Sequence, residues 1–125
     1  MSKKFYICPH CGNIVGMIVD SGAVPVCCGE PMIELKANST DAAQEKHVPV
    51  VTINGDAVKV EVGSVAHPMT DEHYIQWIYI QTEKGGQRKA LKPGDAPVAE
   101  FVLKGDKVTA AYAYCNLHGL WKKDV

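Results

Sequence analysis

Hydrophobic and polar residues alternate along most of the chain after residue 47, with the period of two that is typical of β-strands. The clearest case is the stretch 57–62, AVKVEV, whose valines share one face while Lys59 and Glu61 lie on the other. The stretch before it, 48–53, ends at Asn54-Gly55, a pair that favours a two-residue hairpin turn. Three more strands are predicted at 74–81, 97–104 and 107–115. This spacing predicts a mainly β fold, an antiparallel sandwich or barrel.

The first 36 residues lack this alternation and contain short apolar runs separated by many turn residues. A unit of fewer than about 40 residues usually needs a metal, disulfides or a partner chain for stability. The following segment, ANSTDAAQEK at 37–46, is polar and predicts a linker with one helical turn, beginning at Ser39, Thr40 or Asp41. We therefore expect two domains, residues 1–36 and residues 37–125.

Charge and composition narrow the possible partners and the compartment. The net charge of −1 gives no electrostatic reason to expect nucleic acid. No window approaches the roughly 18 uninterrupted apolar residues that a membrane span requires. The start, MSKKFYICPHCG, has two lysines but no apolar run before Cys8, which is not the pattern of a signal peptide. We therefore expect a cytoplasmic protein without membrane or nucleic-acid partners.

Four of the five cysteines are grouped in the first 28 residues, and the fifth stands alone at Cys115. In a reducing cytosol, grouped cysteines are more often metal ligands or redox groups than structural disulfides. The four read C-x2-C-x15-C-C, and the adjacent pair can bind one metal if the backbone bends between its members. Four thiolates suit tetrahedral zinc or a single iron, and the ligands alone leave that choice open. The alternative is a set of buried, reduced thiols. The members are Cys8, Cys11, Cys27 and Cys28.

Four histidines and Cys115 lie at predicted strand ends and connections, where a rigid sheet presents functional groups. Each histidine alone would be an ordinary surface or hydrogen-bonded residue, but together with an unpaired cysteine they suggest a second metal site. The fifth histidine, His10, lies inside the first cysteine pair and is expected to point to solvent. The four histidines are His47, His67, His73 and His118.

Nitrogen ligands with one thiolate suit copper, zinc or iron. A blue-copper site also pairs Cys and His near the end of a β-sandwich, but it uses two histidines and often a weak axial Met. No methionine follows His118. Structural zinc rarely takes five ligands, so a five-ligand iron with one open position fits better. Such a site should bind a small oxygen species.

Six motifs resemble, in order and spacing, the desulfoferrodoxin family of two-iron superoxide reductases. The resemblance runs from about Tyr6 to Lys122, and the combination of motifs is highly specific. The motifs are CPHCGNIV, VPVCCGEPM, EKHVPV, VGSVAHPMTDEHYIQWI, LKPGDAP and YCNLHGLWK. The resemblance implies a small desulforedoxin-like N-terminal domain and an immunoglobulin-like antiparallel β-sandwich.

The same resemblance implies two irons per chain and the ligands of each. One iron would be held by Cys8, Cys11, Cys27 and Cys28. The second would lie in a square pyramid with Cys115 as its axial ligand. Its equatorial ligands would be His47, His67, His73 and His118.

For function, the resemblance implies one-electron reduction of superoxide to hydrogen peroxide. Lys46 would attract the substrate and help with its protonation, and Glu45 would move onto the open position once the iron is ferric. A rubredoxin is implied as the electron donor, and a homodimer as the assembly. Without the resemblance, Glu45 and Lys46 would read as an ordinary solvated ion pair.

Two other classes of function stay open from the residues alone. A pure electron-transfer protein would need no open coordination position, and a zinc-held structural or interaction module would be colourless. Binding of azide or cyanide would separate the first from an enzyme, and metal analysis with a visible spectrum would separate the second.

Overall fold

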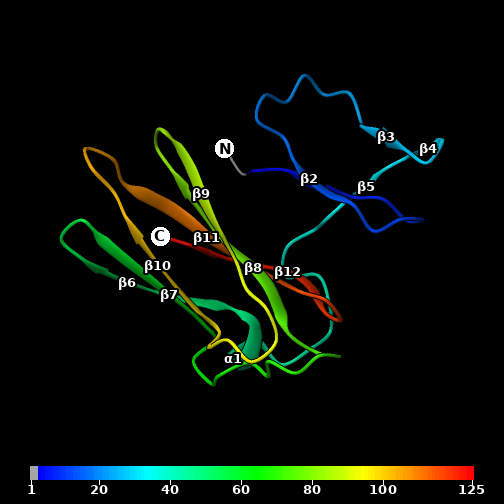
Figure 1. Ribbon diagram of the computed structural model, residues 1–125. Coiled ribbons are helices and arrows are strands. Elements are labelled where there is room, and N and C mark those ends of the chain that lie inside the picture. Colours follow the sequence, from blue (N-terminus) through cyan, green and yellow to red (C-terminus); the bar gives the residue numbers. More distant parts are fainter. Residues whose placement is uncertain (1–2) are drawn as a thin grey trace. The chain divides into compact units, whose positions relative to one another are not determined.

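The computed structural model describes residues 3–125, and its regular secondary structure consists almost entirely of antiparallel β-strands (Figure 1). The chain divides into two compact units, one ending at Lys36 and the other beginning at Ala37, called here the N-terminal and the C-terminal unit. The predicted mainly β fold is confirmed. Among the described residues, no helix has both the length and the apolar character needed to cross a membrane.

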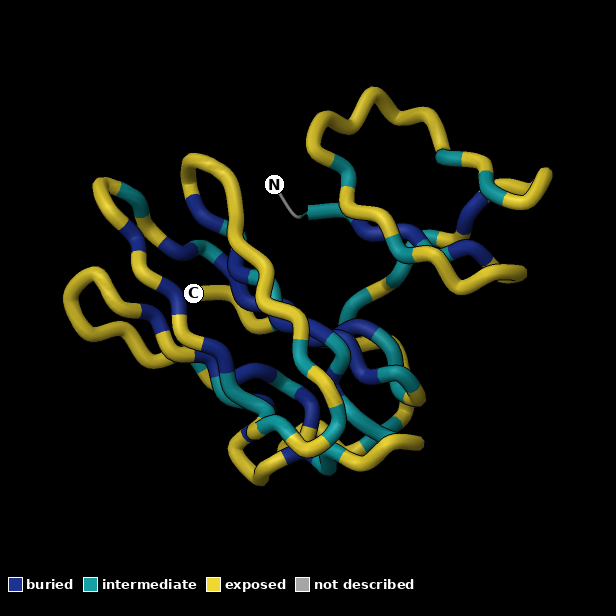
Figure 2. Tube along the Cα trace, in the orientation of Figure 1, coloured by how far each residue is buried: buried dark blue, intermediate teal, exposed yellow. Residues whose placement is uncertain are grey.

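The N-terminal unit contains two small sheets, one with strand order β2-β1-β5 and one that pairs β3 with β4. A buried cluster in this unit consists of Tyr6, Cys8 and Met32, and Figure 2 shows long exposed stretches around it. So small a core fits a unit that depends on a metal. The strands are β1 (Phe5–Ile7), β2 (Ile14–Gly16), β3 (Val26–Cys27), β4 (Glu30–Pro31) and β5 (Ile33–Glu34).

The C-terminal unit is a sandwich of two antiparallel sheets, with strand orders β10-β7-β6 and β12-β11-β8-β9. A single helical turn, α1 (Gln44–His47), precedes the first strand. The strands are β6 (Pro49–Asn54), β7 (Ala57–Val62), β8 (Ile75–Thr82), β9 (Gly85–Ala90), β10 (Val98–Val102), β11 (Val108–Cys115) and β12 (Gly119–Asp124).

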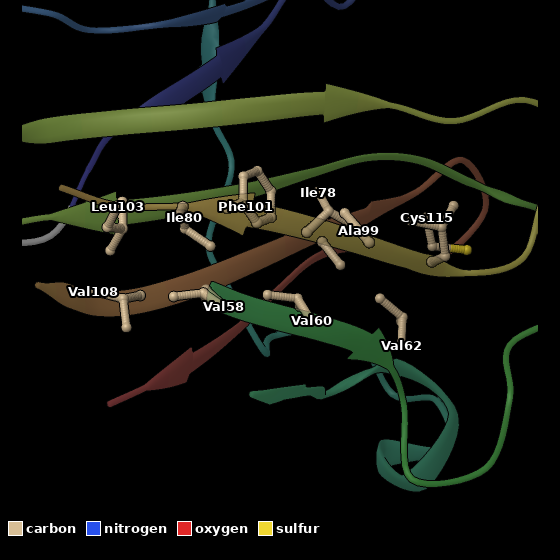
Figure 3. Close-up of a cluster of buried hydrophobic side chains, with 13 residues drawn as sticks. Val58, Val60, Val62, Ile78, Ile80, Ala99, Phe101, Leu103, Val108 and Cys115 are labelled. Atoms are coloured by element: carbon tan, nitrogen blue, oxygen red, sulfur yellow. The ribbon is translucent and has the colours of Figure 1, made fainter. Parts of the chain in front are cut away.

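The core between the two sheets comes from the alternating faces of their strands, as Figure 3 shows. The valines of β7 point inward while Lys59 is exposed, which confirms the pattern read from AVKVEV. Cys115 belongs to this same buried cluster, with no exposed surface, at the end of β11. The packing of the sandwich interior therefore places a thiol at one end of the sheet.

Two strands of the C-terminal unit were not predicted from the sequence. One lies between the predicted strands 74–81 and 97–104, where a turn at Glu83 and Lys84 is followed by β9, which begins at Gly85. Every residue of β9 is exposed, so this edge strand has no apolar face to reveal it. β12 was also missed, because the last predicted strand ended at Cys115.

The segment predicted as a linker is bound to the sandwich at its start. The Asn38 side chain donates to Lys122 O (3.2 Å) and accepts from Lys122 N (2.9 Å), so it acts as a short partner for the edge of β12. The helical turn does not begin at Ser39, Thr40 or Asp41. It begins at Gln44 after Ala43, and no side chain caps it.

Candidate metal centres

The four N-terminal cysteines converge from two turns of the N-terminal unit. Cys8 follows β1, Cys27 ends β3, and the other two lie in the turns after them. Their ligand atoms all lie within 4.8 Å of one another, and all four cysteines are free. The backbone bends between the adjacent pair as the spacing requires, since Cys28 has a positive φ of 53°.

Crowding of the four sulfurs makes this cluster electrostatically unfavourable without a cation. The Cys11 N–H points at Cys8 Sγ (3.4 Å), and this hydrogen bond lowers the pKa of the Cys8 thiol to about 6. Contacts with the Cys8 and Cys11 sulfurs raise the pKa of Cys27 to about 12. Four thiolates at this spacing repel one another, and a bound metal cation removes that repulsion.

A second cluster gathers at one end of the C-terminal sandwich, from segments far apart in the chain. His47 ends α1, His67 and His73 lie in the connection between β7 and β8, and Cys115 ends β11. The ligand atoms of these four lie within 4.8 Å of one another. His118, in the turn between β11 and β12, joins them, because its Nδ1 lies 3.1 Å from His47 Nε2 and 3.9 Å from Cys115 Sγ.

The four imidazole rings form a square. Going round from His47 through His67 and His73 to His118 and back, neighbouring ring centroids lie 4.7, 4.6, 5.0 and 4.9 Å apart. Neighbouring rings stand at 75° to 84° to each other, whereas His47 and His73 face each other across the square at 6.5 Å. With Cys115 as a fifth donor, an octahedral metal would keep one open position.

Hydrogen bonds to backbone carbonyls fix the protonation of two of the rings. His47 Nδ1 donates to Ala43 O (2.7 Å), and His67 Nδ1 donates to Pro68 O (2.6 Å). In the neutral rings both Nε2 atoms are therefore acceptors, yet they lie 3.2 Å apart. Two acceptors cannot bond each other, so this contact calls for a cation between them.

Burial supports the same conclusion. It lowers the pKa of His67 to about 4 and lowers the pKa of His47 and His73 as well, which keeps these rings neutral and able to bind a metal at neutral pH. His73 Nε2 is buried and has no hydrogen-bond partner within residues 3–125. Burial raises the pKa of the Cys115 thiol, so a metal is needed to hold it as a thiolate. These donors fit an iron ion.

Trp121 supports the cluster and was not found from the sequence. Its ring stacks on His47 at 4.8 Å between centroids, and its Nε1 donates to His118 O at 3.1 Å. An aromatic residue in a strand gives no sequence signal for such a role. His10, by contrast, lies in neither cluster. It is half-exposed, as expected, with its Nε2 3.1 Å from Glu30 Oε1.

Glu45 and Lys46 directly precede His47, and both side chains are exposed. Neither takes part in an ion pair within residues 3–125. The charge of Lys46 reaches the cluster: after burial and the neighbouring histidines, it is a further cause that lowers the pKa of His73.

The backbone of this pair is held by the start of the connection after β7. Glu45 O accepts hydrogen bonds from Val65 N (2.8 Å) and Ser64 Oγ (3.2 Å). A Cβ on Gly63 would lie 2.6 Å from the same carbonyl oxygen, so only glycine allows this approach.

Comparison with known proteins identifies the family. A family model described as desulfoferrodoxin matches residues 39–124. The desulfoferrodoxin of Nitratidesulfovibrio vulgaris is 52% identical over 121 residues, which cover 97% of this chain and 95% of that protein. The superoxide reductase of Pyrococcus horikoshii is 41% identical over 113 residues, which cover 75% of this chain and 97% of that protein.

A solved structure agrees over the whole length. The superoxide reductase from Treponema pallidum has a TM-score of 0.84 at 42% identity, and the match covers 99% of this chain and 100% of that chain. The resemblance found in the sequence is therefore confirmed. The four-cysteine cluster and the cluster of four histidines and a cysteine match two iron centres, and the chain belongs to the desulfoferrodoxin family.

Proposed function

We propose that the chain is a superoxide reductase that converts superoxide, one electron and two protons into hydrogen peroxide, without producing oxygen. The observation that carries this proposal is the square of four imidazoles with a buried thiol as fifth donor. The superoxide reductases of Pyrococcus horikoshii and Treponema pallidum support it as relatives. When bound, ferrous iron supplies the electron at its open sixth position. The proposed ligands are His47, His67, His73, His118 and Cys115.

Cys115 is proposed as the axial ligand opposite the open position. A thiolate there donates electron density and favours both oxidation of the metal and release of the product. The backbone N–H groups of Leu117 and His118 are directed at the Cys115 sulfur and lower its pKa against the effect of burial. Such hydrogen bonds stabilise the thiolate and tune its donor strength.

Lys46 and Glu45 are proposed as the residues that act on the substrate and on the open position. Superoxide is a small anion, and an exposed cation next to ligand His47 raises its local concentration. Lys46 is also suited to assist protonation of the product. Glu45 is the proposed occupant of the open position after the electron has been transferred, since its side chain is exposed while its carbonyl is held.

The N-terminal unit is proposed as a desulforedoxin-like iron domain over residues 1–36, and residues 37–125 as the superoxide reductase domain. The division of the chain after Lys36 supports these boundaries. In the N-terminal unit, a metal bound by Cys8, Cys11, Cys27 and Cys28 would supply much of the folding free energy, because the cluster around Tyr6 and Met32 is small. The five free thiols are compatible with the proposed cytoplasmic location. We propose a rubredoxin as the electron donor.

A homodimer is proposed in which the N-terminal units of two copies cover each other. This unit exposes large aliphatic residues that a protein of its size would normally bury. Ile18 is 94% exposed, Val19 81% and Val26 67%. A second copy of the same surface is the occupant that matches their chemistry.

The most direct test of the function is metal analysis together with a visible spectrum and superoxide turnover of the purified protein. We expect two irons per chain and one hydrogen peroxide formed for each superoxide consumed, with no oxygen released. Azide or cyanide should bind the second iron. A colourless zinc protein, or an iron protein that binds neither anion, would rule out the proposal in favour of a structural or electron-transfer protein.

The two irons should be lost independently. Cys28→Ser removes one of four thiolates, so we expect the four-thiolate chromophore to disappear while most superoxide reduction remains. Iron content and the visible spectrum measure the first effect, and superoxide consumption measures the second. If a folded Cys28→Ser protein lost both irons, the assignment of two separate sites would be wrong.

Lys46 should act through its charge. In Lys46→Ala we expect superoxide reduction to slow by about 10-fold at low salt and to depend less on ionic strength, because a steering charge has been removed. The matched control is Lys104→Ala, a lysine near the opposite end of the sandwich from Cys115. An unchanged rate and an unchanged salt dependence in Lys46→Ala would contradict the role.

Glu45→Ala provides a contrast at the neighbouring position. It should leave the reduction fast while opening the oxidised site to external anions.

Cys115→Ser should abolish the sulfur-to-iron charge-transfer band of the second site and lower superoxide reduction by at least about 100-fold, because loss of a direct ligand exceeds the usual effect of its supporting groups. The four imidazoles could still hold ferrous iron, so we expect weaker retention without global unfolding. If Cys115 were only a buried thiol, serine would cost some stability and nothing else. A variant that keeps both the band and the activity would remove Cys115 from the site.

Introducing a charged residue at the exposed aliphatic surface of the N-terminal unit tests the proposed homodimer. Ile18→Glu should give a monomer in sedimentation velocity, because a carboxylate would have to be buried in the interface. Ile53→Glu is the matched control, since Ile53 is 53% exposed but lies in the C-terminal unit. A native protein that sediments as a monomer, or an Ile18→Glu protein that stays dimeric, would contradict the proposed interface.

A further inference from the structure

Asn116 makes three hydrogen bonds to the segment that carries His73. Its side-chain Oδ1 accepts from Tyr74 N at 2.9 Å, and its Nδ2 donates to Glu72 O at 2.9 Å. Its backbone N donates to Tyr74 O at 3.2 Å. His73 is therefore bonded to Asn116 through the residues on both sides of it. Asn116 itself directly follows Cys115.

We propose that Asn116 is a positioning residue that joins the axial donor Cys115 and the equatorial donor His73 into one preorganised unit. The inference rests on the ligand set proposed above and assigns a role to a residue that binds no metal itself. Asn116 does not touch the reacting atoms. It acts by holding His73 so that its Nε2 faces the same metal position as the other donor atoms.

The need for this contact follows from where the β-ladder ends. β11 pairs with β8 as far as Cys115 and Ile75, and the register shifts between Tyr114 and Cys115. Ile75 is the first residue of β8, so His73, two residues before it, lies outside the regular ladder. The side-chain amide of Asn116 adds two hydrogen bonds between these segments, at a point where the backbone pairing of β11 with β8 has ended. Backbone groups at such a point are otherwise left to water.

His73 also depends on this contact more than His47 and His67 do. His47 and His67 are buried, and their Nδ1 atoms donate to carbonyls, whereas His73 is only partly buried. Its backbone is held on one side by the turn with Thr70, in which Thr70 N donates to His73 O at 3.0 Å. Without the Asn116 side chain, Glu72 O and Tyr74 N would lose these partners, and the turn would be held less firmly. Ordering it on metal binding would then cost conformational entropy.

The consequence is selective loss of metal affinity at the second site. Groups that orient a metal ligand typically change affinity by about 10- to 100-fold when they are removed. We expect a loss in this range for Asn116→Ala, with the first iron unaffected. In Asn116→Asp, the acceptor for Tyr74 N is kept and the donor to Glu72 O is lost. The iron affinity of its second site should therefore lie between that of the native chain and that of Asn116→Ala.

The test is an anaerobic competition titration of the full chain with ferrous iron and a chelator, reading the two sites separately from their visible bands after oxidation. The matched control is Asp106→Ala. Asp106 also bridges two segments, since its Oδ1 accepts from Lys84 N at 3.2 Å and from Lys107 N at 2.8 Å, but it lies near the opposite end of the sandwich from Cys115 and holds no proposed ligand. We expect Asn116→Ala to lose second-site affinity while Asp106→Ala keeps it at a similar loss of thermal stability.

His73→Ala separates failure of this inference from failure of the proposed function. If His73→Ala binds iron at the second site as tightly as the native chain, the proposed ligand set is wrong. If His73→Ala loses affinity but Asn116→Ala and Asp106→Ala behave alike, the positioning role of Asn116 is wrong. Should Asn116→Ala fail to fold, Asn116→Asp decides the question: a native second-site affinity in that variant would overturn the role.

Discussion

The register of β11 is the constraint on which the second metal cluster depends. Cys115 lies on the same face of the strand as Ala111 and Ala113, inside the sandwich. A slip of one residue would turn its sulfur away from the space between the two sheets and bring Tyr114, which is buried on the other face of β11, into that space. β11 pairs with β8 on one side and β12 on the other, so two ladders and the core packing fix this register together. The position of the thiol is thus set by the hydrophobic interior, before any metal binds.

The two metal clusters relate to their surroundings in opposite ways. In the C-terminal unit, strands and core place the donors, and carbonyls such as Ala43 O and Pro68 O set the tautomer of the imidazoles. The metal there completes an arrangement that already exists. In the N-terminal unit, the buried cluster around Tyr6 and Met32 is small, and the cysteines themselves form part of it. A metal there acts as part of the core.

Much of this fold and its sites follows from the sequence, with limits that have physical causes. Alternation in AVKVEV reveals β7 because one face is buried, whereas β9 has no buried face and therefore no pattern. The four cysteines are close in sequence and reveal a site by spacing alone. The second cluster spans His47 to His118, 71 positions apart, and only the fold brings its donors together. Asn116 and Trp121 act through geometry that spacing does not encode.

Glu45 and Lys46 combine a backbone that is held in place with side chains that are exposed, and the proposed chemistry needs both. The Glu45 carbonyl, two residues before the ligand His47, accepts hydrogen bonds from Val65 N and Ser64 Oγ. It can lie this close to the chain because Gly63 has no Cβ. Both charged side chains nevertheless remain exposed. A charge on a mobile backbone would disturb His47 whenever it moved. Because the backbone is held, the carboxylate and the ammonium can change rotamer in solvent while the square of imidazoles keeps its geometry.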